Sequence, residues 1–535
     1  MRTSLIKKLL PSWSNAALAL LSAVLLILAF PDFELWWTAW FALVPLMWAV
    51  EREKASFVRS FVTGWIFGTA FFFGTCWWLT FAPINYAGFP PWLAYSGMVF
   101  VALIVGVFPA LFAGILSVLL RRFGSWAFLA APFVWVFTEF LRYWVTGNNW
   151  NAIGYSQAFD ELLLPLTRLG GVMIVGWACA ASAGFLLFAA IGGLGKSLFP
   201  RLIPFVVLLA FVGGTRFIDA NTRVLQKSDL RTRVVAVQPN VPMSGLDYQK
   251  WGQLRQHQVD LAEAELKKLS EQRITDNEKL ITAEQPTTTN ERPTLVILPE
   301  SPMNFMYEDD REFQKFINDF ARRNNVSVMF NSAEPDATNG KYFNSAVMVG
   351  PEGREVGQYD KIFLLPFGEA VPSFLEGIVP GFVGNFSYGR EYDILPVGDA
   401  KAGVMICFES HFGQLSREYV RNGADVIIEM TNDGYLGPTP VLRQHLANAV
   451  FRAVETNRPV LRVTNVGITA YINERGEVLD PLPPYTEGTR VWSVAKSDGG
   501  QTFYVRYGDW FAWLCTVVTL GLLAFCAAKR RQNEA

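Results

Sequence analysis

The chain has 535 residues, of which 51% are hydrophobic and only 17% are charged. With 43 Phe and 18 Trp it is too apolar for an ordinary soluble protein, so the composition favours a membrane protein. The formal net charge of −1 offers no basic surplus to neutralise phosphates, which argues against a nucleic-acid-binding protein.

Apolar residues concentrate toward the two ends of the chain. Residues 13–220 are almost continuously hydrophobic, residues 221–506 resemble a soluble α/β protein in composition, and residues 509–527 form a last apolar stretch. A membrane-spanning helix needs about 20 apolar residues. We therefore expect about eight spans, near residues 13–30, 34–50, 60–80, 92–120, 126–143, 165–191, 199–218 and 509–527.

Basic residues predict the orientation of these spans, because cytoplasmic loops collect Lys and Arg. With the N-terminus inside, the segments at 51–60, 121–122, 196–201 and 529–531, all basic, fall on the cytoplasmic side. A cleaved signal peptide is the alternative for the first 30 residues, but LILAFPDF has no small-residue cleavage pattern. Both termini are thus expected in the cytoplasm.

The predicted organisation has three parts: a membrane domain with seven transmembrane helices (1–220), an extracytoplasmic domain (221–506), and a C-terminal transmembrane helix with a cytoplasmic tail (507–535). Within the middle part, strands are expected at 233–240, 294–300, 326–333, 342–350, 402–410, 424–430, 458–465 and 467–473. Helices are expected near 249–272, 309–323, 411–422 and 441–456. Strands that alternate with helices and are apolar throughout are typical of sheets buried between helical layers.

Cys407 ends the strand AGVMICFES and is the one cysteine between residues 221 and 506. In an oxidising compartment a structural cysteine usually has a disulfide partner. A lone thiol there is either buried and inert or present for its chemistry. The other four cysteines fall in predicted spans, where a cysteine behaves as a small hydrophobe.

Two further ionisable residues lie where functional side chains gather in such sheets, at or near strand ends. Glu300 ends TLVILPE, and Lys361 lies in the loop YDKIFLLPFGEAVP. A glutamate can accept a proton, a lysine can stabilise an oxyanion, and a thiolate can attack a carbonyl. Each also has a simpler explanation, since Lys361 could be a solvated loop charge and Glu300 a strand-end cap.

The segments ILPES, YDKIFLLPFGE and GVMICFES, in that order, resemble the glutamate, lysine and cysteine motifs of the nitrilase superfamily. The resemblance implies a nitrilase-like (CN hydrolase) αββα sandwich with Cys407 as nucleophile, Glu300 as general base and Lys361 as oxyanion stabiliser. Glu369 and Glu409 match glutamates that support the site. Because this domain is inserted between spans, the chain resembles the apolipoprotein N-acyltransferases of the bacterial inner membrane, in the segments TNDGYLG and RVTNVGITA as well.

That resemblance implies a ping-pong acyl transfer. Cys407 would take the sn-1 chain of a phospholipid as a thioester, and the chain would pass to the α-amine of a diacylglyceryl apolipoprotein. No cofactor or metal is expected, because the chain has three histidines and contains neither an HExxH nor a CxxC motif. The protein is expected to act as a monomer. A lid or substrate contact is expected from Tyr435, Leu436 and Phe386, the last within the segment 384–393.

The chain departs from the family pattern at Phe408, often a tyrosine, and at Tyr435-Leu436, often Trp-Phe. His411, four residues after Cys407, could instead be a papain-like base. Two other functions stay open: a membrane-tethered amidase that uses water as acceptor, and a transporter with an external regulatory domain. The second is disfavoured because the spans contain few ionisable residues and no obvious broken-helix repeat.

Overall fold

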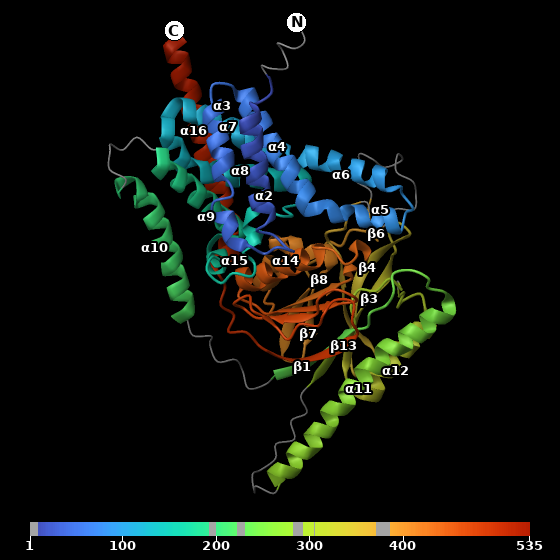
Figure 1. The fold of residues 1–535 in the computed structure, drawn as a ribbon. Coiled ribbons are helices and arrows are strands. Elements are labelled where there is room, and N and C mark those ends of the chain that lie inside the picture. The colour runs from blue at the N-terminus through green and yellow to red at the C-terminus, as the bar shows by residue number, and fades with distance from the viewer. Residues whose placement is uncertain are drawn as a thin grey trace. The chain divides into compact units, whose positions relative to one another are not determined.

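The computed structural model describes residues 9–191, 199–221, 231–281, 293–303, 305–366, 368–370 and 386–534 (Figure 1). The chain divides into two compact units. The helical unit comprises Met1–Arg223, Thr439–Glu455 and Thr502–Ala535, and the α/β unit comprises Val224–Pro438 and Thr456–Gln501. Residues 282–292, and residues 384 and 385 of the segment 384–393, lie outside the described residues.

The helical unit contains the apolar helices. They are α2 (Trp13–Ile27), α3 (Val44–Glu53), α4 (Phe57–Cys76), α6 (Pro91–Val105), α7 (Val107–Phe123), α8 (Ala127–Thr146), α9 (Thr167–Ile191), α10 (Phe199–Asn221) and α16 (Trp510–Glu534). The short helices α5 (Phe81–Asn85) and α15 (Phe503–Tyr507) also belong to this unit. The side chains of α4 and α7 pack closely, since a Cβ added at Gly64 would lie 2.6 Å from that of Ala113. Small residues commonly allow such close approach between membrane helices.

Among the described residues, five segments are long and apolar enough to cross a membrane: Phe57–Asn85, Pro91–Thr146, Leu164–Ile191, Phe199–Ile218 and Trp510–Lys529. The chain is therefore a membrane protein with several long apolar helices. The expected span over 34–50 differs from the structure, which has a 3₁₀ helix at Trp36–Trp40 and then the ten-residue α3. The count of eight spans stays a prediction.

Helix α14 (Val441–Thr456) packs with the helical unit over nearly its whole length. Its buried Gln444 accepts hydrogen bonds from the indole N–H groups of Trp78 (3.1 Å) and Trp150 (3.0 Å), and donates one to the carbonyl of Thr75 (3.0 Å). A buried amide is stable only when it is hydrogen-bonded in this way. The sequence-based boundaries, which place 439–455 with residues 221–506, differ from the structural units at this segment.

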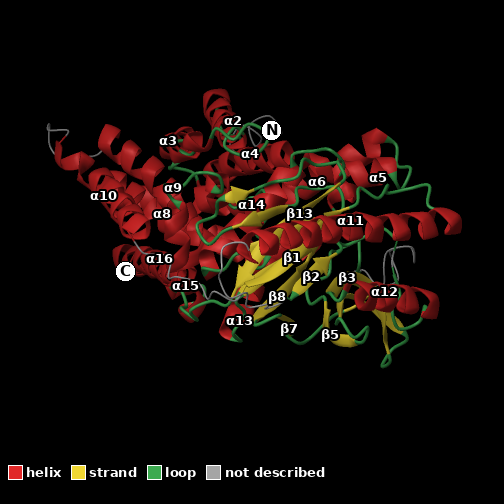
Figure 2. Cartoon of the chain, turned by 90° about the horizontal axis from the view of Figure 1, so that it is seen from below, coloured by secondary structure: helices red, strands yellow, loops and turns green. Residues whose placement is uncertain are grey.

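The α/β unit contains two mixed sheets among its described residues (Figure 2). The first sheet has the order β13-β1-β2-β3-β4-β5, with β6 beside β4. Its strands are β1 (Arg231–Gln238), β2 (Thr294–Ile297), β3 (Ser327–Asp336), β4 (Lys341–Val349), β5 (Glu355–Asp360), β6 (Phe386–Ser387) and β13 (Gly488–Ala495). Strands β1, β2 and β3 are parallel, and β4 returns antiparallel to β3.

The second sheet has the order β12-β11-β10-β9-β8-β7. Its strands are β7 (Ile394–Val397), β8 (Ala400–Ile406), β9 (Val426–Thr431), β10 (Val460–Thr464), β11 (Ala470–Ile472) and β12 (Val478–Leu479). Strands β8, β9 and β10 are parallel. The parallel strands of each sheet are nearly continuous runs of buried apolar residues, as expected where both faces of a sheet are covered.

The two sheets contact each other through their inner faces. The Thr464 hydroxyl of β10 donates to the Gln238 side chain of β1 (3.1 Å), and the Thr232 hydroxyl of β1 donates to the carbonyl of Val397 in β7 (2.9 Å). Helices α11 (Tyr248–Ile281) and α12 (Arg311–Asn324) pack on the outer face of the first sheet. Helix α13 (Gly413–Arg421) packs on the second sheet, where its Tyr419 hydroxyl donates to the carbonyl of Val404 in β8 (2.5 Å). This is the layered α/β sandwich that the sequence predicts.

Candidate active site

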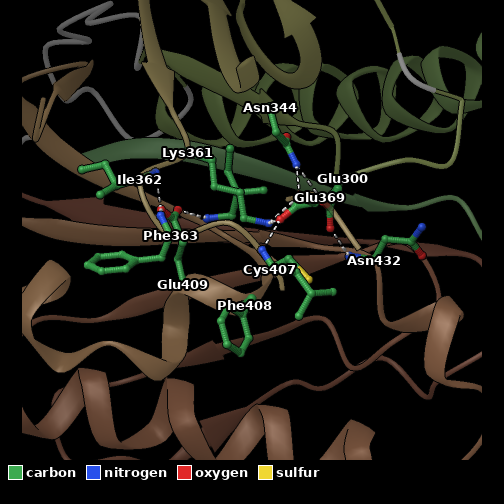
Figure 3. Close-up of polar contacts among 12 residues, drawn as sticks. Glu300, Asn344, Lys361, Ile362, Phe363, Glu369, Cys407, Phe408, Glu409 and Asn432 are labelled. Carbon is green, nitrogen blue, oxygen red and sulfur yellow. Dashed lines mark hydrogen bonds and ion pairs between the residues drawn. The ribbon is translucent and has the colours of Figure 1, made fainter. Parts of the chain in front are cut away.

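Glu300, Lys361 and Cys407 come from three different strand ends and are gathered in one place (Figure 3). Glu300 follows β2, and Lys361 follows β5 of the same sheet. Cys407 follows β8 of the second sheet. The site therefore lies where the two facing sheets end, which is where such folds collect their functional side chains.

Cys407 lies at a sharp turn of the backbone. Strand β8 ends at Ile406, and a 3₁₀ helix begins at Cys407 and runs to His411. Cys407 has a φ of +53°, in the left-handed region that residues with a Cβ rarely adopt. Backbone strain of this kind persists only where the surrounding contacts enforce it, and it is frequent at active sites. The Cys407 residue remains partly exposed.

The buried Glu409 carboxylate enforces that turn. One oxygen, Oε2, accepts a hydrogen bond from the backbone N–H of Ile406 (2.8 Å), directly before the cysteine. The other, Oε1, accepts from the N–H groups of Ile362 (2.8 Å) and Phe363 (3.0 Å) and from the Tyr359 hydroxyl (2.7 Å). Burial raises the pKa of Glu409 to about 7, against the opposing effects of Lys361 and these hydrogen bonds. Glu409 thus ties the cysteine turn to the loop that carries Lys361.

Lys361 is a buried ammonium, with 1% of its side chain exposed. It forms an ion pair with Glu369 at 2.8 Å. Burial alone would lower the pKa of Lys361, but the carboxylates of Glu369 and Glu300 raise it above its ordinary value of 10.5. The lysine is consequently a permanent cation beside the thiol, and the simpler explanation of a solvated loop charge is excluded.

Glu300 is held through both of its carboxylate oxygens. Its Oε2 accepts from the backbone N–H of Asn432 (3.0 Å), and its Oε1 accepts from the Asn344 side chain (3.3 Å). Burial raises the pKa of Glu300 above its ordinary value of 4.5, while Lys361 acts in the opposite direction. A carboxylate with a raised pKa is a better proton acceptor, as a general base requires.

The Cys407 thiol has a raised pKa, although two features of its surroundings act to lower it. A nearby ammonium and a helix start would favour the thiolate. In the structure, burial and the charge of Glu300 raise the pKa of Cys407 well above its ordinary value of 9.0, and Lys361 only partly offsets them. The resting group is therefore a thiol, and a base must remove its proton before it can attack.

Asn344 is a site residue that sequence reasoning missed. Its amide nitrogen donates to both Glu369 (2.6 Å) and Glu300 (3.3 Å), so it bridges two carboxylates that would otherwise repel each other. The amide of Asn331 fixes its orientation by donating to the Asn344 side-chain oxygen at 2.6 Å. The available signal was an asparagine within the apolar run YFNSAVMVG, where a polar side chain needs a buried partner.

Replacing Asn344 with alanine is expected to slow the nucleophilic reaction predicted for Cys407 by about tenfold, the cost of one hydrogen bond to a charged group. Because the Asn344 bond lowers the pKa of Glu300, its loss should also move the acid limb of the rate profile to higher pH. Single-turnover rates measured against pH test this. Asn339→Ala, at an exposed turn of the same hairpin, is the control that should leave the profile unchanged.

The remaining predicted residues lie at varied depths. Phe386 in β6 is partly exposed, and its N–H donates to the carbonyl of Glu369 (3.0 Å), which brings it beside the site. Tyr435 is 47% exposed and Leu436 is partly exposed. The His411 ring donates from Nδ1 to the carbonyl of Phe408 (2.8 Å), so this nitrogen is occupied within its own turn. The contribution of Tyr435, Leu436 and Phe386 to a lid stays a prediction.

Two facing sheets with a Glu–Lys–Cys site at their strand ends define an enzyme of the nitrilase superfamily. Residues 275–504 match the family described as "Carbon-nitrogen hydrolase". Residues 22–185 match the "Apolipoprotein N-acyltransferase N-terminal domain". The chain is 31% identical to the apolipoprotein N-acyltransferase of Geobacter metallireducens, over 96% of this chain and 95% of that protein. It is 30% identical to that of Thermotoga maritima, over 97% and 95%.

The chain belongs to the apolipoprotein N-acyltransferases, a family of acyltransferase enzymes, and the resemblance seen in its motifs is confirmed. Among solved structures, it is similar to Nit3 of Saccharomyces cerevisiae, a nitrilase-superfamily protein, with 16% identity and a TM-score of 0.37 over 50% of this chain and 93% of that one.

Proposed function

We propose that this protein transfers the sn-1 acyl chain of a membrane phospholipid to the α-amine of the N-terminal diacylglyceryl-cysteine of an apolipoprotein, through a thioester on Cys407. The observation that carries the proposal is the grouping of a thiol, a raised-pKa carboxylate and a buried ammonium in a chain rich in apolar helices. The names of its relatives support the acceptor, since they are apolipoprotein N-acyltransferases.

In the first half-reaction, Glu300 takes the proton of the Cys407 thiol as the sulfur attacks the ester carbonyl carbon. The negative charge that develops on the carbonyl oxygen is stabilised by the Lys361 ammonium. When the C–O ester bond breaks, Glu300 returns the proton to the leaving oxygen and a lysophospholipid departs. A thioester of Cys407 remains, and Glu300 is again ionised.

In the second half-reaction, the neutral α-amine of the apolipoprotein attacks the thioester carbonyl. Glu300 accepts a proton from the attacking nitrogen and delivers it to the Cys407 sulfur as the C–S bond breaks. An amide forms and the thiol is regenerated. Glu369 and Glu409 hold Lys361 and the cysteine turn in place throughout, through the contacts described above.

We assign catalysis to residues 221–506 and membrane insertion to residues 1–220 and 507–535. The catalytic part works on the periplasmic side of the bacterial inner membrane, with both termini in the cytoplasm, and the protein acts as a monomer. The basic segments on alternate loops support this orientation. A phospholipid ester lies at the membrane surface, so a domain tethered by apolar helices at both ends can reach it.

Mass spectrometry of the purified protein tests the proposal. After incubation with a phospholipid whose sn-1 chain carries an isotopic label, the labelled acyl group should be found on the Cys407 peptide. Adding a diacylglyceryl-cysteine peptide should then discharge it to a labelled amide. If lysophospholipid and free fatty acid accumulate at the same rate without the peptide, the enzyme uses water and the amidase alternative holds.

The acylation rate should depend on pH through Glu300. Since only the ionised carboxylate can accept the thiol proton, the rate should rise with pH, with a midpoint above the ordinary glutamate value of 4.5. A Glu300→Gln variant should lose this limb and react about 10²-fold more slowly at neutral pH, within the range for one general base. Rapid-quench measurement of the labelled thioester, at on the order of ten pH values between pH 4 and pH 9, checks both results. If the Glu300→Gln variant keeps the same rise of rate with pH, another residue is the general base.

A further inference from the structure

The end of strand β9 lies directly beside the nucleophile. Strands β8 and β9 are parallel neighbours, and Ile406 pairs with Met430 in their register. The next residues along the two strands are Cys407 and Thr431. Thr431 is fully buried, so its hydroxyl has to find its partners among the groups around the site.

A buried chain of polar contacts leads away from the Thr431 hydroxyl. That hydroxyl donates to the Asp433 carboxylate (Oδ1, 3.3 Å). The other oxygen of Asp433 accepts from the Arg462 guanidinium at 2.7 Å, and Arg462 also pairs with Glu429 at 2.5 Å. Arg462 and Glu429 are fully buried, and Asp433 is nearly so. Charges at such depth are retained only when they are paired.

Asp433 has little freedom to move within this set. A Cβ added at Gly467 would lie 2.1 Å from the Asp433 carboxylate, so the backbone of that turn closes over it. The same short segment also holds the general base, because the N–H of Asn432 donates to Glu300. The turn from Thr431 to Asp433 therefore hydrogen-bonds to Glu300, which accepts the thiol proton, and lies beside Cys407, which gives it.

We propose that Thr431 is a positioning residue for Cys407, and that Asp433, fixed by Arg462, sets the orientation of the Thr431 hydroxyl. In the resting enzyme the hydroxyl hydrogen points to Asp433. When Glu300 removes the thiol proton, the hydroxyl turns and donates to the thiolate. No covalent bond changes at Thr431, and the proton leaves the thiol only toward Glu300.

The charges around the thiol agree with this arrangement. The charges of Glu300, Lys361 and Asp433 shift the pKa of the thiol, and Cys407 in turn raises that of Arg462. Glu369 and Glu409 raise the pKa of Lys361. Burial and Glu300 raise the pKa of Cys407, and Asp433 adds to this, whereas Lys361 and the hydrogen bond with Thr431 lower it. Lys361 and the Thr431 hydroxyl both stabilise the thiolate, and without that hydroxyl the thiolate would lose one of these two interactions.

Two readouts separate positioning from mere packing, and both rest on the proposed role of Cys407. The first is the single-turnover rate of thioester formation at saturating labelled phospholipid. The second is the pH dependence of Cys407 alkylation by iodoacetamide, followed on the Cys407 peptide by mass spectrometry. The variants are Thr431→Val, which has nearly the shape of threonine without its hydroxyl, and Thr431→Ser, which restores the hydroxyl.

Thr431→Val should form the thioester about tenfold more slowly, as expected for a lost hydrogen bond to a charged group, with KM unchanged. Its alkylation curve should move to higher pH. Thr431→Ser should return both readouts to within about threefold of the wild type. Equal losses in the two variants, or none in Thr431→Val, would overturn the inference. If Thr431→Val does not accumulate, Thr431→Ala compared with Thr431→Ser decides in the same way.

A failure of the proposed function can be distinguished from a failure of the inference about Thr431. If the wild-type protein carries no acyl group on Cys407, the proposed function fails before any variant is compared. If the wild type is acylated on Cys407 and the valine and serine variants behave alike, only the role of Thr431 is wrong.

Discussion

A Cys407→Ala variant should form no acyl-enzyme, with the transfer rate reduced more than about 10⁴-fold, as is typical when a covalent nucleophile is removed. The substitution deletes only the sulfur. Alanine has the same Cβ and therefore meets the same backbone constraint at φ +53°, so the turn and the Glu409 contacts should survive. Thermal unfolding in detergent should be close to that of the wild type.

The four other cysteines are the matched controls for that result. Cys76, Cys179, Cys515 and Cys526 all belong to helices of the helical unit. Their alanine variants should keep the labelled thioester on Cys407. Should Cys407→Ala still acquire label from phospholipid after denaturation and digestion, the position of that label would identify the true nucleophile and refute our assignment.

The sequence pointed to Glu300, Lys361 and Cys407 because each follows an apolar strand or lies in its exit loop and because their motifs resemble those of the family, and their catalytic roles stay predictions. Their environment was not predictable in the same way. The Glu409 carboxylate accepts hydrogen bonds from Tyr359, Ile362 and Phe363, which precede it by about 50 residues, so its bracing role depends on how the two sheets meet. The raised pKa of Cys407 has the same origin, since burial outweighs the lysine that the sequence puts nearby.

The fold shows a similar division. The strands with continuous apolar runs, such as β8 and β9, were predicted within a few residues. Strand β5 was missed because EVGQYD is polar and its residues are exposed or partly exposed, except for the fully buried Tyr359. The alternating pattern of β13 was also overlooked. Helix α14 was predicted as a helix, but its membership of the helical unit comes from the contacts of Gln444, which join residues more than 290 positions apart.

Replacing Lys361 with methionine should have two separable effects. It removes the cation that we assign to the oxyanion, which is expected to slow thioester formation about 10³-fold. It also leaves the Glu369 carboxylate without its buried partner, and breaking such a pair destabilises a fold by about 3–5 kcal/mol. Rapid-quench thioester formation and thermal unfolding in detergent measure the two effects independently.

The double variant Lys361→Met/Glu369→Gln separates chemistry from stability. The Glu369→Gln change removes the unpaired charge, and the side-chain amide that it introduces can still accept a hydrogen bond from Asn344, so most of the lost stability should return. Thioester formation should remain as slow as in Lys361→Met, because no cation faces the carbonyl oxygen. If activity recovers together with the unfolding temperature, Lys361 supports the structure only, and the oxyanion has to be stabilised by another group.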